Sequence, residues 1–452
     1  MTNETRSLEP DENPNSRFVV DPPWPIRGLL SRFVGREADP QRRDKLRAAF
    51  EAKRKALGEP HRVEYFHQLD DPYSYLTAQV LSDFVARYDV EFIPHLVNAA
   101  AGKDQPEMDK LAAWARRDCA HIAHHYGLRF PSDAPVHPSS DQLCWAANVL
   151  AGLGAQAFIQ RVESICGALW AGTGDTASQT DESAQAALAH GTERRAKLGH
   201  YSGAIFYYGG EFYWGVDRLL HLERRLQSLG LGSTDAALVP RPAIDVAGVD
   251  ASALTLHFYP SLNSPYTAII YDRTIDMARQ CGIRLEHKPV LPMVMRGVPA
   301  STTKGKYIVF DTKREAELLG VGFGPLVFAM GTPTRNAYSL LAWAKSQDKD
   351  IAFMSAALRL AFAEGVSLAG TRGMRRAVTE AGLDWHEAKS ILGNDDWKAT
   401  TARHQQEMVN GMGLWGVPSY RLTGPDGEPD LAVWGQDRLW LIAAEIRRRA
   451  GR

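Results

Sequence analysis

Two short stretches of the sequence place a polar residue where a helix is expected to begin. Ser264 lies in the run Asn-Ser-Pro-Tyr (263–266), and Asp71 lies in the similar run Asp-Asp-Pro-Tyr (70–73). Proline is tolerated in the first helical turn because its missing N–H has no partner there. A hydroxyl donor and a helix N-terminus both favour a thiolate over a thiol, so Ser264 is a candidate thiolate-binding residue. The alternative is an N-cap serine with no catalytic role.

A second pair of runs resembles each other near the end of each half. Trp-Gly-Val-Asp-Arg-Leu occupies 214–219, and Trp-Gly-Gln-Asp-Arg-Leu occupies 434–439. In both, a predicted strand ends at Trp-Gly, and Asp217 or Asp437 stands at the start of a final helix. A carboxylate there can accept hydrogen bonds from unpaired N–H groups and suits the positive end of the helix.

Other candidate motifs favour structural roles. The three histidines His121, His124 and His125 have spacing that can share one helix face, but no His-Glu-x-x-His motif is present, so we predict an ordinary helix and no metal site. The run 320–325 is rich in glycine but lacks nucleotide-binding spacing, and we predict a loop. No Cys-x-x-Cys pair occurs, which argues against a disulfide scaffold and a cysteine zinc site. The cysteines are Cys119, Cys144, Cys166 and Cys281.

The elements that would position these residues form two similar blocks. Each block opens with a strand, a helix and a strand, over 63–94 and 254–289, which indicates a right-handed parallel crossover. A helical stretch follows, which in the second block includes 336–346, 351–364 and 371–381. Each block then closes with two strands and a helix. From Asp71 to Asp217 is 146 residues and from Ser264 to Asp437 is 173, so the second block has the longer insertion.

Composition sets the class of protein. The chain has 452 residues, of which 44% are hydrophobic, with a formal charge of -1. This balance excludes a wholly disordered chain and indicates no nucleic-acid or membrane partner. No apolar leader and no spanning segment are recognised, so we predict a cytoplasmic protein. The proline-rich segment 9–27 is expected to be extended, and 40–57 to be an exposed helix.

The motifs of the second block occur in the order of a known family. They are the run 263–266, Lys-Gly-Lys-Tyr (304–307) with Asp311 and Arg314, Gly-Val-Pro (416–418), and the run 434–439. Over 252–450 this block resembles the DsbA-like thioredoxin superfamily, above all 2-hydroxychromene-2-carboxylate isomerases and kappa-class glutathione transferases. The first block resembles the same family more faintly, over 61–228.

This resemblance implies an α/β fold with two tandem thioredoxin-like domains, each with an inserted helical subdomain. The predicted organisation is an N-terminal extension over 1–60, a degenerate domain over 61–228, a linker over 229–252 and the active domain over 253–452. The two domains would form an internal pseudo-dimer within a monomer.

The resemblance also implies a glutathione site in the second block. Ser264 would hydrogen-bond the glutathione sulfur, and Pro418 would be the cis-proline beside the backbone of Val417. Gln436 and Asp437 would hold the γ-glutamyl end. Many relatives use an asparagine after the second strand, but residues 295–299 contain no counterpart of it.

Further residues of the second block would form the substrate side of this site. Lys304 or Lys306 would contact the glycine carboxylate of glutathione or an acidic substrate; solvated surface lysines are the alternative. Tyr266, Trp415 and the helices of 325–410 would line the substrate pocket.

The first block departs from the family at two positions. Asp71 stands where Ser264 stands, and Ala204 aligns with Pro418. A carboxylate beside a sulfur would disfavour a thiolate by like-charge repulsion. We therefore predict a degenerate structural partner, with a separate site that uses Asp71 as an acid or base as the alternative.

The predicted function is that of a glutathione-dependent isomerase or transferase. The thiolate held by Ser264 would add to an electrophilic, aromatic, carboxylate-bearing small molecule. One alternative is a noncatalytic thioredoxin-like binding or scaffold protein. A disulfide oxidoreductase is less favoured because neither helix begins with a cysteine.

Overall fold

The computed structural model describes residues 13–100 and 102–451. The chain divides into two compact units, and each is described by itself. Residues 44–242 form one unit, which we call the Asp71 unit. Residues 243–452, together with the segment before residue 44, form the other, which we call the Ser264 unit.

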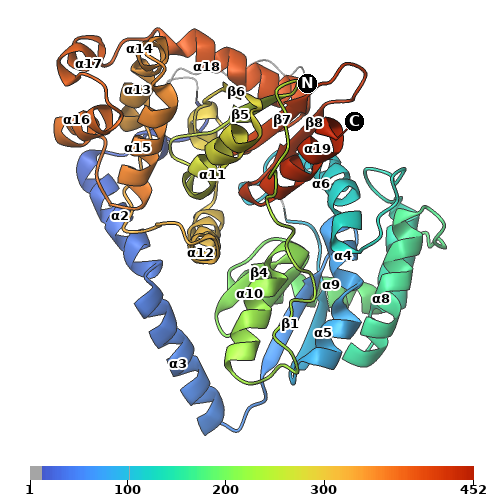
Figure 1. Cartoon of the computed structure of the whole chain (residues 1–452). Coiled ribbons are helices and arrows are strands. Elements are labelled where there is room, and N and C mark those ends of the chain that lie inside the picture. The colour runs from blue at the N-terminus through green and yellow to red at the C-terminus, as the bar shows by residue number, and fades with distance from the viewer. Residues whose placement is uncertain (1–12, 101, 452) are drawn as a thin grey trace. The chain divides into compact units, whose positions relative to one another are not determined.

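The Asp71 unit contains one four-stranded sheet with helices around it (Figure 1). Its strand order is β2-β1-β3-β4; β1 is parallel to β2 and antiparallel to β3, and β3 is antiparallel to β4. The elements are β1 (Arg62–His67), α4 (Pro72–Ala78), α5 (Leu81–Arg87), β2 (Glu91–Leu96), α6 (Met108–Ile122), η2 (His124–Tyr126), α7 (Ser140–Leu150), α8 (Ala155–Trp170), α9 (Glu182–Leu198), β3 (Ile205–Tyr208), β4 (Glu211–Trp214) and α10 (Gly215–Ser228).

The Ser264 unit has a sheet of the same order, β6-β5-β7-β8, with the same parallel and antiparallel pairs. Its helices α13 to α17 gather beside that sheet (Figure 1). The elements from residue 243 onward are β5 (Thr255–Tyr259), α11 (Pro265–Cys281), β6 (Arg284–His287), η3 (Met293–Arg296), α12 (Thr302–Leu319), α13 (Thr332–Ser339), α14 (Leu341–Ser346), α15 (Asp350–Phe362), α16 (Thr371–Glu380), α17 (Trp385–Ile391), α18 (Trp397–Gln406), the π-helical turn η4 (Glu407–Gly411), β7 (Ser419–Thr423), β8 (Leu431–Trp434), η5 (Gln436–Arg438) and α19 (Leu439–Ala450).

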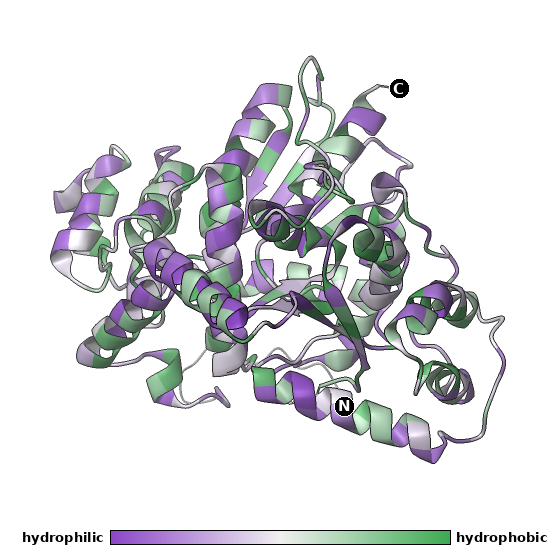
Figure 2. Cartoon of the chain, turned by 90° about the horizontal axis from the view of Figure 1, so that it is seen from below, coloured by the Kyte–Doolittle hydropathy of each residue, from purple (hydrophilic) through white to green (hydrophobic). Residues whose placement is uncertain are grey.

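The order of elements confirms the predicted strand–helix–strand openings and strand–strand–helix endings. The helices mix hydrophilic and hydrophobic residues along their length (Figure 2), as expected for helices that cover a sheet on one face. The helix predicted over 336–346 is two helices, α13 and α14, separated at Leu340. The domain limits proposed from the sequence stay predictions.

The N-terminal segment differs from the expected extended chain. It contains α1 (Arg17–Val20) and α2 (Trp24–Glu37). Ser16 caps α1 by accepting a hydrogen bond from the amide of Phe18, and Pro25 lies in the first turn of α2, where a proline is tolerated. The prolines therefore mark helix starts here. The expected exposed helix is confirmed as α3 (Pro40–Ala56), which has no buried residue.

The prediction of one helix for the three histidines holds only for His121, which lies in α6. Helix α6 ends at Ile122, and His124 lies in the short 3-10 turn η2, which closes at Gly127 with φ of 69°. The change from an α-helix to a 3-10 turn after Ile122 thus places His121 in one element and His124 and His125 in the next. The absence of an apolar leader was predicted for residues 1–12, which lie outside the described residues. Among the described helices none is long and apolar enough to cross a bilayer.

A buried polar chain joins the helical insertion to the sheet in the Ser264 unit. The hydroxyl of Tyr271 on α11 lies 2.8 Å from Nε2 of His287 on β6. Nδ1 of the same ring lies 2.8 Å from a carboxylate oxygen of Asp350, the first residue of α15. Because buried polar groups need partners, these hydrogen bonds hold the start of α15 against β6.

Two helical glycines of the Ser264 unit should respond in opposite ways to alanine. A Cβ at Gly373 in α16 would lie 2.0 Å from the carbonyl oxygen of Ser367, whereas one at Gly305 in α12 would meet nothing within 4 Å. We expect Gly373→Ala to lower the free energy of unfolding by about 1–3 kcal/mol. Gly305→Ala should raise it by about 0.5–1 kcal/mol because alanine restricts the unfolded chain. Urea unfolding of both variants measures the difference, and equal effects would contradict the packing described for α16.

Candidate functional site

Strand register brings three distant segments of the Ser264 unit to one edge of its sheet. Tyr259, at the end of β5, pairs with Ser419, at the start of β7. Ser419 in turn pairs with Trp434, at the end of β8. The turn that carries Ser264, the loop that ends at Pro418 and the turn that carries Asp437 must therefore all leave the sheet at this edge.

Ser264 lies where the sequence predicts, at the N-cap of α11. Its Oγ accepts a hydrogen bond from the amide of Thr267 at 3.1 Å. The same hydroxyl donates to the carbonyl oxygen of Val417 at 3.4 Å, across 153 residues of sequence. The Val417–Pro418 peptide is cis, which confirms the prediction for Pro418. Ser264 is 7% exposed, so this contact is largely sheltered from water.

The loop before Pro418 is held by packing and by a residue that the sequence did not single out. The ring of Trp415 lies 4.9 Å from that of Trp434. Gly416 packs directly against Trp434, where a Cβ would lie 1.8 Å from the indole ring. The buried guanidinium of Arg296 donates to the carbonyl oxygen of Trp415 at 2.6 Å and to that of Leu291 at 2.7 Å.

Arg296 lies in the stretch where the family's asparagine was not found. Burial lowers the pKa of its guanidinium to about 10, so it stays charged at neutral pH. A lone arginine within the apolar run 290–298 was the available signal, because a buried charge is retained only where it finds partners. Arg296 thus holds the loop before Pro418 in place, from the stretch in which no counterpart of the family's asparagine was found.

Gln436 and Asp437 lie in the 3-10 turn η5, which packs against α11 and precedes α19. The final helix therefore begins at Leu439, two residues after Asp437. The side-chain amide of Gln436 donates to Oε2 of the buried Glu315 at 2.6 Å. The carboxylate of Asp437 lies 3.7 Å from the guanidinium of Arg438. The side-chain amide nitrogen of Gln436 is thus engaged within the protein.

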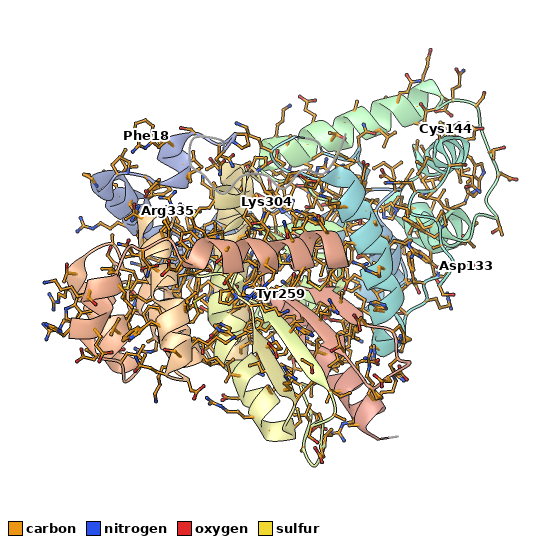
Figure 3. The ribbon with its side chains drawn as sticks, turned by 90° about the horizontal axis from the view of Figure 1, so that it is seen from above. Phe18, Asp133, Cys144, Tyr259, Lys304 and Arg335 are labelled. Carbon is orange, nitrogen blue, oxygen red and sulfur yellow. The ribbon has the colours of Figure 1, made fainter. Side chains whose placement is uncertain are left out.

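The proposed substrate-side residues come from α11 and α12. The hydroxyl of Tyr266 donates to Asp311 at 2.8 Å, and Arg314 pairs with the same carboxylate at 3.1 Å. This pairing joins α11 to α12. Lys304 is half-buried in the first turn of α12 (Figure 3), and Lys306 is exposed. The structure thus uses the Tyr266 hydroxyl to align two helices.

The Asp71 unit repeats several of these contacts. Tyr73 donates to Asp118 at 2.7 Å, and in both units the tyrosine and the aspartate are 45 residues apart. The amide of Gly215 bonds the carbonyl oxygen of Ala204 at 2.7 Å, as the amide of Gly435 bonds that of Pro418 at 3.0 Å. Ala204 has a φ of 50°, which is a strained backbone region for alanine.

Asp71 caps α4 with its carboxylate. One oxygen accepts from the amide of Tyr73 at 3.1 Å and the other from the hydroxyl of Ser74 at 3.0 Å. Burial outweighs these bonds and raises the pKa of Asp71 to about 7, and the neighbouring charge of Asp70 acts in the same direction. A group that exchanges its proton near neutral pH therefore stands where the Ser264 unit has a hydroxyl.

Comparison with known proteins identifies the fold of one half. Residues 255–447 match the family model described as a DSBA-like thioredoxin domain. No curated protein matches the chain. This half of the protein thus has a mixed α/β, thioredoxin-like DsbA fold, as the resemblance implied.

Solved structures include several similar chains. A probable DsbA oxidoreductase from Streptomyces coelicolor is 16% identical, with a TM-score of 0.34, and the match covers 44% of this chain and 90% of that one. A 2-hydroxychromene-2-carboxylate isomerase is 17% identical, with a TM-score of 0.35 and coverage of 43% and 95%. The cytosolic disulfide reductase DsbM from Pseudomonas aeruginosa is 21% identical, with a TM-score of 0.32 and coverage of 43% and 98%.

Replacing Arg296 should destabilise the loop before Pro418. The variant Arg296→Gln leaves two buried carbonyl groups without their charged donor, and we expect the free energy of unfolding to fall by about 2–4 kcal/mol. Arg284→Gln is the control because its ion pair with Glu286 is exposed, and it should change stability by less than about 0.5 kcal/mol. Urea unfolding tests both, and a similar loss in the control would remove the special role of Arg296.

The raised pKa of Asp71 predicts a pH-dependent stability. Between its ordinary value of 3.8 and about 7, the folded state keeps a proton that the unfolded state releases. Stability should therefore fall as the pH rises through this window. Asp71→Asn keeps a capping side chain and removes the titration, so it should be more stable than the wild type at pH 8 by about 1–3 kcal/mol and equal at pH 4. Asp83→Asn, on exposed α5 surface, should show no such divergence in urea unfolding at the two pH values.

Proposed function

We propose that the Ser264 unit is a glutathione-dependent isomerase or transferase. The observation that carries this proposal is the contact between the Ser264 hydroxyl and the carbonyl oxygen of Val417. It joins a hydroxyl at a helix N-terminus to the backbone of an adjacent loop. A thiol-bearing peptide needs both elements, one for its sulfur and one for its main chain.

Ser264 is suited to stabilise a thiolate. Its present bond to Val417, at 3.4 Å, is long for a hydroxyl donor, so turning the proton toward a sulfur would sacrifice little. The amide of Thr267 already donates to Oγ, and the 17-residue helix α11 adds a positive end. Both effects favour negative charge at this point and would lower the pKa of a bound thiol.

The surrounding residues fit the polar ends of glutathione. The indole N–H of Trp415 is buried and has no hydrogen-bond partner among the described residues, so it is a donor without an acceptor. The carbonyl oxygen of Gln436 and the carboxylate of Asp437 are acceptors suited to the γ-glutamyl ammonium group. The backbone of Val417 would bind the extended main chain.

Glutathione would supply a thiolate that adds reversibly to an electrophilic carbon of the substrate. We propose an aromatic substrate that carries a carboxylate, with Lys304 or Lys306 as its counter-charge and Trp415 as its apolar neighbour. Ser264 would hold the sulfur while the substrate turns, and the helices of 325–410 would exclude water. The cytoplasmic location stays a prediction.

The shared sheet order and the paired Tyr–Asp contacts support a tandem duplication, in which the Asp71 unit has lost the thiolate site. Disulfide exchange is less well supported. Cys281 lies at the far end of α11 from Ser264, and burial raises the pKa values of the Cys166 and Cys281 thiols, which disfavours reactive thiolates.

Calorimetric titration of the full chain with glutathione tests the proposal. We expect saturable binding by the wild type and a loss of at least tenfold in affinity for Asp437→Asn, which removes the charge that faces the ammonium group. Ser264→Ala should bind glutathione but raise the pKa of the bound thiol by about one unit, measured by thiolate absorbance against pH.

Ser139→Ala is the matched control because Ser139 also caps a helix, by accepting from the amide of Gln142 at 3.2 Å. Both serine variants should lose about 1 kcal/mol of stability, but only Ser264→Ala should change the bound thiol. Absence of glutathione binding by the wild type would refute the proposal and leave a noncatalytic binding or scaffold protein. Reduction of insulin disulfides would instead support the redox alternative.

A further inference from the structure

The Asp71 unit contains a cavity at the same sheet edge where the Ser264 unit has its proposed site. Its volume is about 130 Å³, and its lining includes Asp71, Gly203 and Trp214. Trp214 ends β4 and pairs with Ile205 of β3, so the register that places Ser264 in the other unit also places this cavity. The unit has therefore kept a recess where the predicted thiolate site was lost.

The charges around this cavity are acidic. Three aspartates line it, from two elements: Asp70 and Asp71 before α4, and Asp109 in α6. His137 also lines it and is exposed; no lysine or arginine is among the lining residues that the structure describes. A thiolate or a carboxylate would meet like charges here, whereas a cation would meet opposite ones. Glutathione, which carries two carboxylates, does not suit this recess.

A buried acceptor without a partner also lines the cavity. Gln68 is 7% exposed, and its Oε1 has no hydrogen-bond partner among the described residues. Gly203 lies beside it, since a Cβ there would be 2.6 Å from Cβ of Gln68 and 2.8 Å from Oδ2 of Asp71. The absence of a side chain at Gly203 thus leaves the amide oxygen and the carboxylate side by side. An unpaired buried acceptor is unfavourable unless a ligand or water donates to it.

Two aromatic rings complete the lining. Tyr73 and Trp214 both line the cavity, and their rings meet edge to face at 5.3 Å. Aromatic faces attract ammonium groups, and the attraction strengthens away from water. A cavity of about 150 Å³ is known to hold benzene. This one is slightly smaller, at about 130 Å³, but it is open to solvent on one side, so part of a slightly larger molecule can lie at its opening.

We propose that this cavity is a second binding site, which takes a compact organic ammonium ion of about the size of benzylamine. The ammonium group would donate to Asp71 and to Oε1 of Gln68, and its hydrocarbon part would lie against Tyr73 and Trp214. The proposal does not depend on glutathione binding at Ser264.

Binding should depend on the charge of Asp71. The charged or titratable groups that face it are Asp70 in the same turn, Tyr65 on β1 and Arg195 on α9, with Asp109 and His137 across the cavity. Arg195 is buried and donates to the carbonyl oxygens of Ser202 and Asn98; it keeps its positive charge but does not line the cavity. The pKa of Asp71 is raised to about 7, so its carboxylate forms fully only above that pH. A cation should therefore bind more tightly at pH 8 than at pH 5.5.

Calorimetry of the full chain with three probes of one shape tests the site at pH 8. Benzylamine is cationic, benzyl alcohol is neutral and benzoate is anionic. We expect saturable binding of benzylamine, at least tenfold weaker binding of benzyl alcohol and no binding of benzoate. Asp71→Asn should weaken benzylamine at least tenfold and abolish the difference between pH 8 and pH 5.5.

Two controls separate this site from other causes. Asp83→Asn removes a carboxylate of the same unit that does not line the cavity, and Ser264→Ala alters the other unit; neither should change the affinity for benzylamine. Urea unfolding of Asp71→Asn checks that the variant is folded, and Gln68→Leu, which removes the acceptor at similar volume, should weaken benzylamine on its own. No binding of benzylamine, equal binding of the three probes, or unchanged binding by both Asp71→Asn and Gln68→Leu would overturn the proposal.

Discussion

The antiparallel pairing of β5 with β7 is the constraint from which the proposed site of the Ser264 unit follows. Tyr259 pairs with Ser419 and Ser419 with Trp434, so three chain segments leave the sheet together. A shift of one residue in this register would turn every side chain of the strand to the opposite face. The buried residues of β7 oppose such a shift, because Tyr420 and Leu422 have no exposed surface. Hydrophobic packing of β7 thus fixes the register on which the proposed polar site depends.

The two units share a frame, by which we mean the sheet and the contacts that join its strands, helices and loops, but they differ at the residue that caps the first helix. Both have the same strand order, a tyrosine that bonds an aspartate 45 residues later, and a glycine amide that bonds the residue before β3 or β7. These contacts join elements of the frame to one another. The residue that caps the first helix differs between the units, with Asp71 in one and Ser264 in the other. The frame therefore tolerates a change of chemistry at this position.

Sequence patterns predicted the frame well because its signals are local. Alternating strands, a proline after the capping residue and the Trp-Gly ends each act over a few residues, and the structure places them as expected. Arg296 was missed because its role depends on two carbonyl groups, one of them 119 residues away, which no local pattern records. The N-terminal prolines were misinterpreted because proline is compatible with both an extended chain and a first helical turn.

The net charge of the chain gave no indication of either proposed site. A formal charge of -1 over 452 residues indicated no charged partner, yet the Asp71 cavity is lined by three aspartates without a lysine or arginine among its described residues. Binding responds to charges within a few ångströms, since water and salt screen those farther away. A hydroxyl at a helix start can donate to an anion, whereas a carboxylate at the equivalent turn accepts from a cation. The residue in this turn thus contributes to the opposite charge preferences that we propose for the two units.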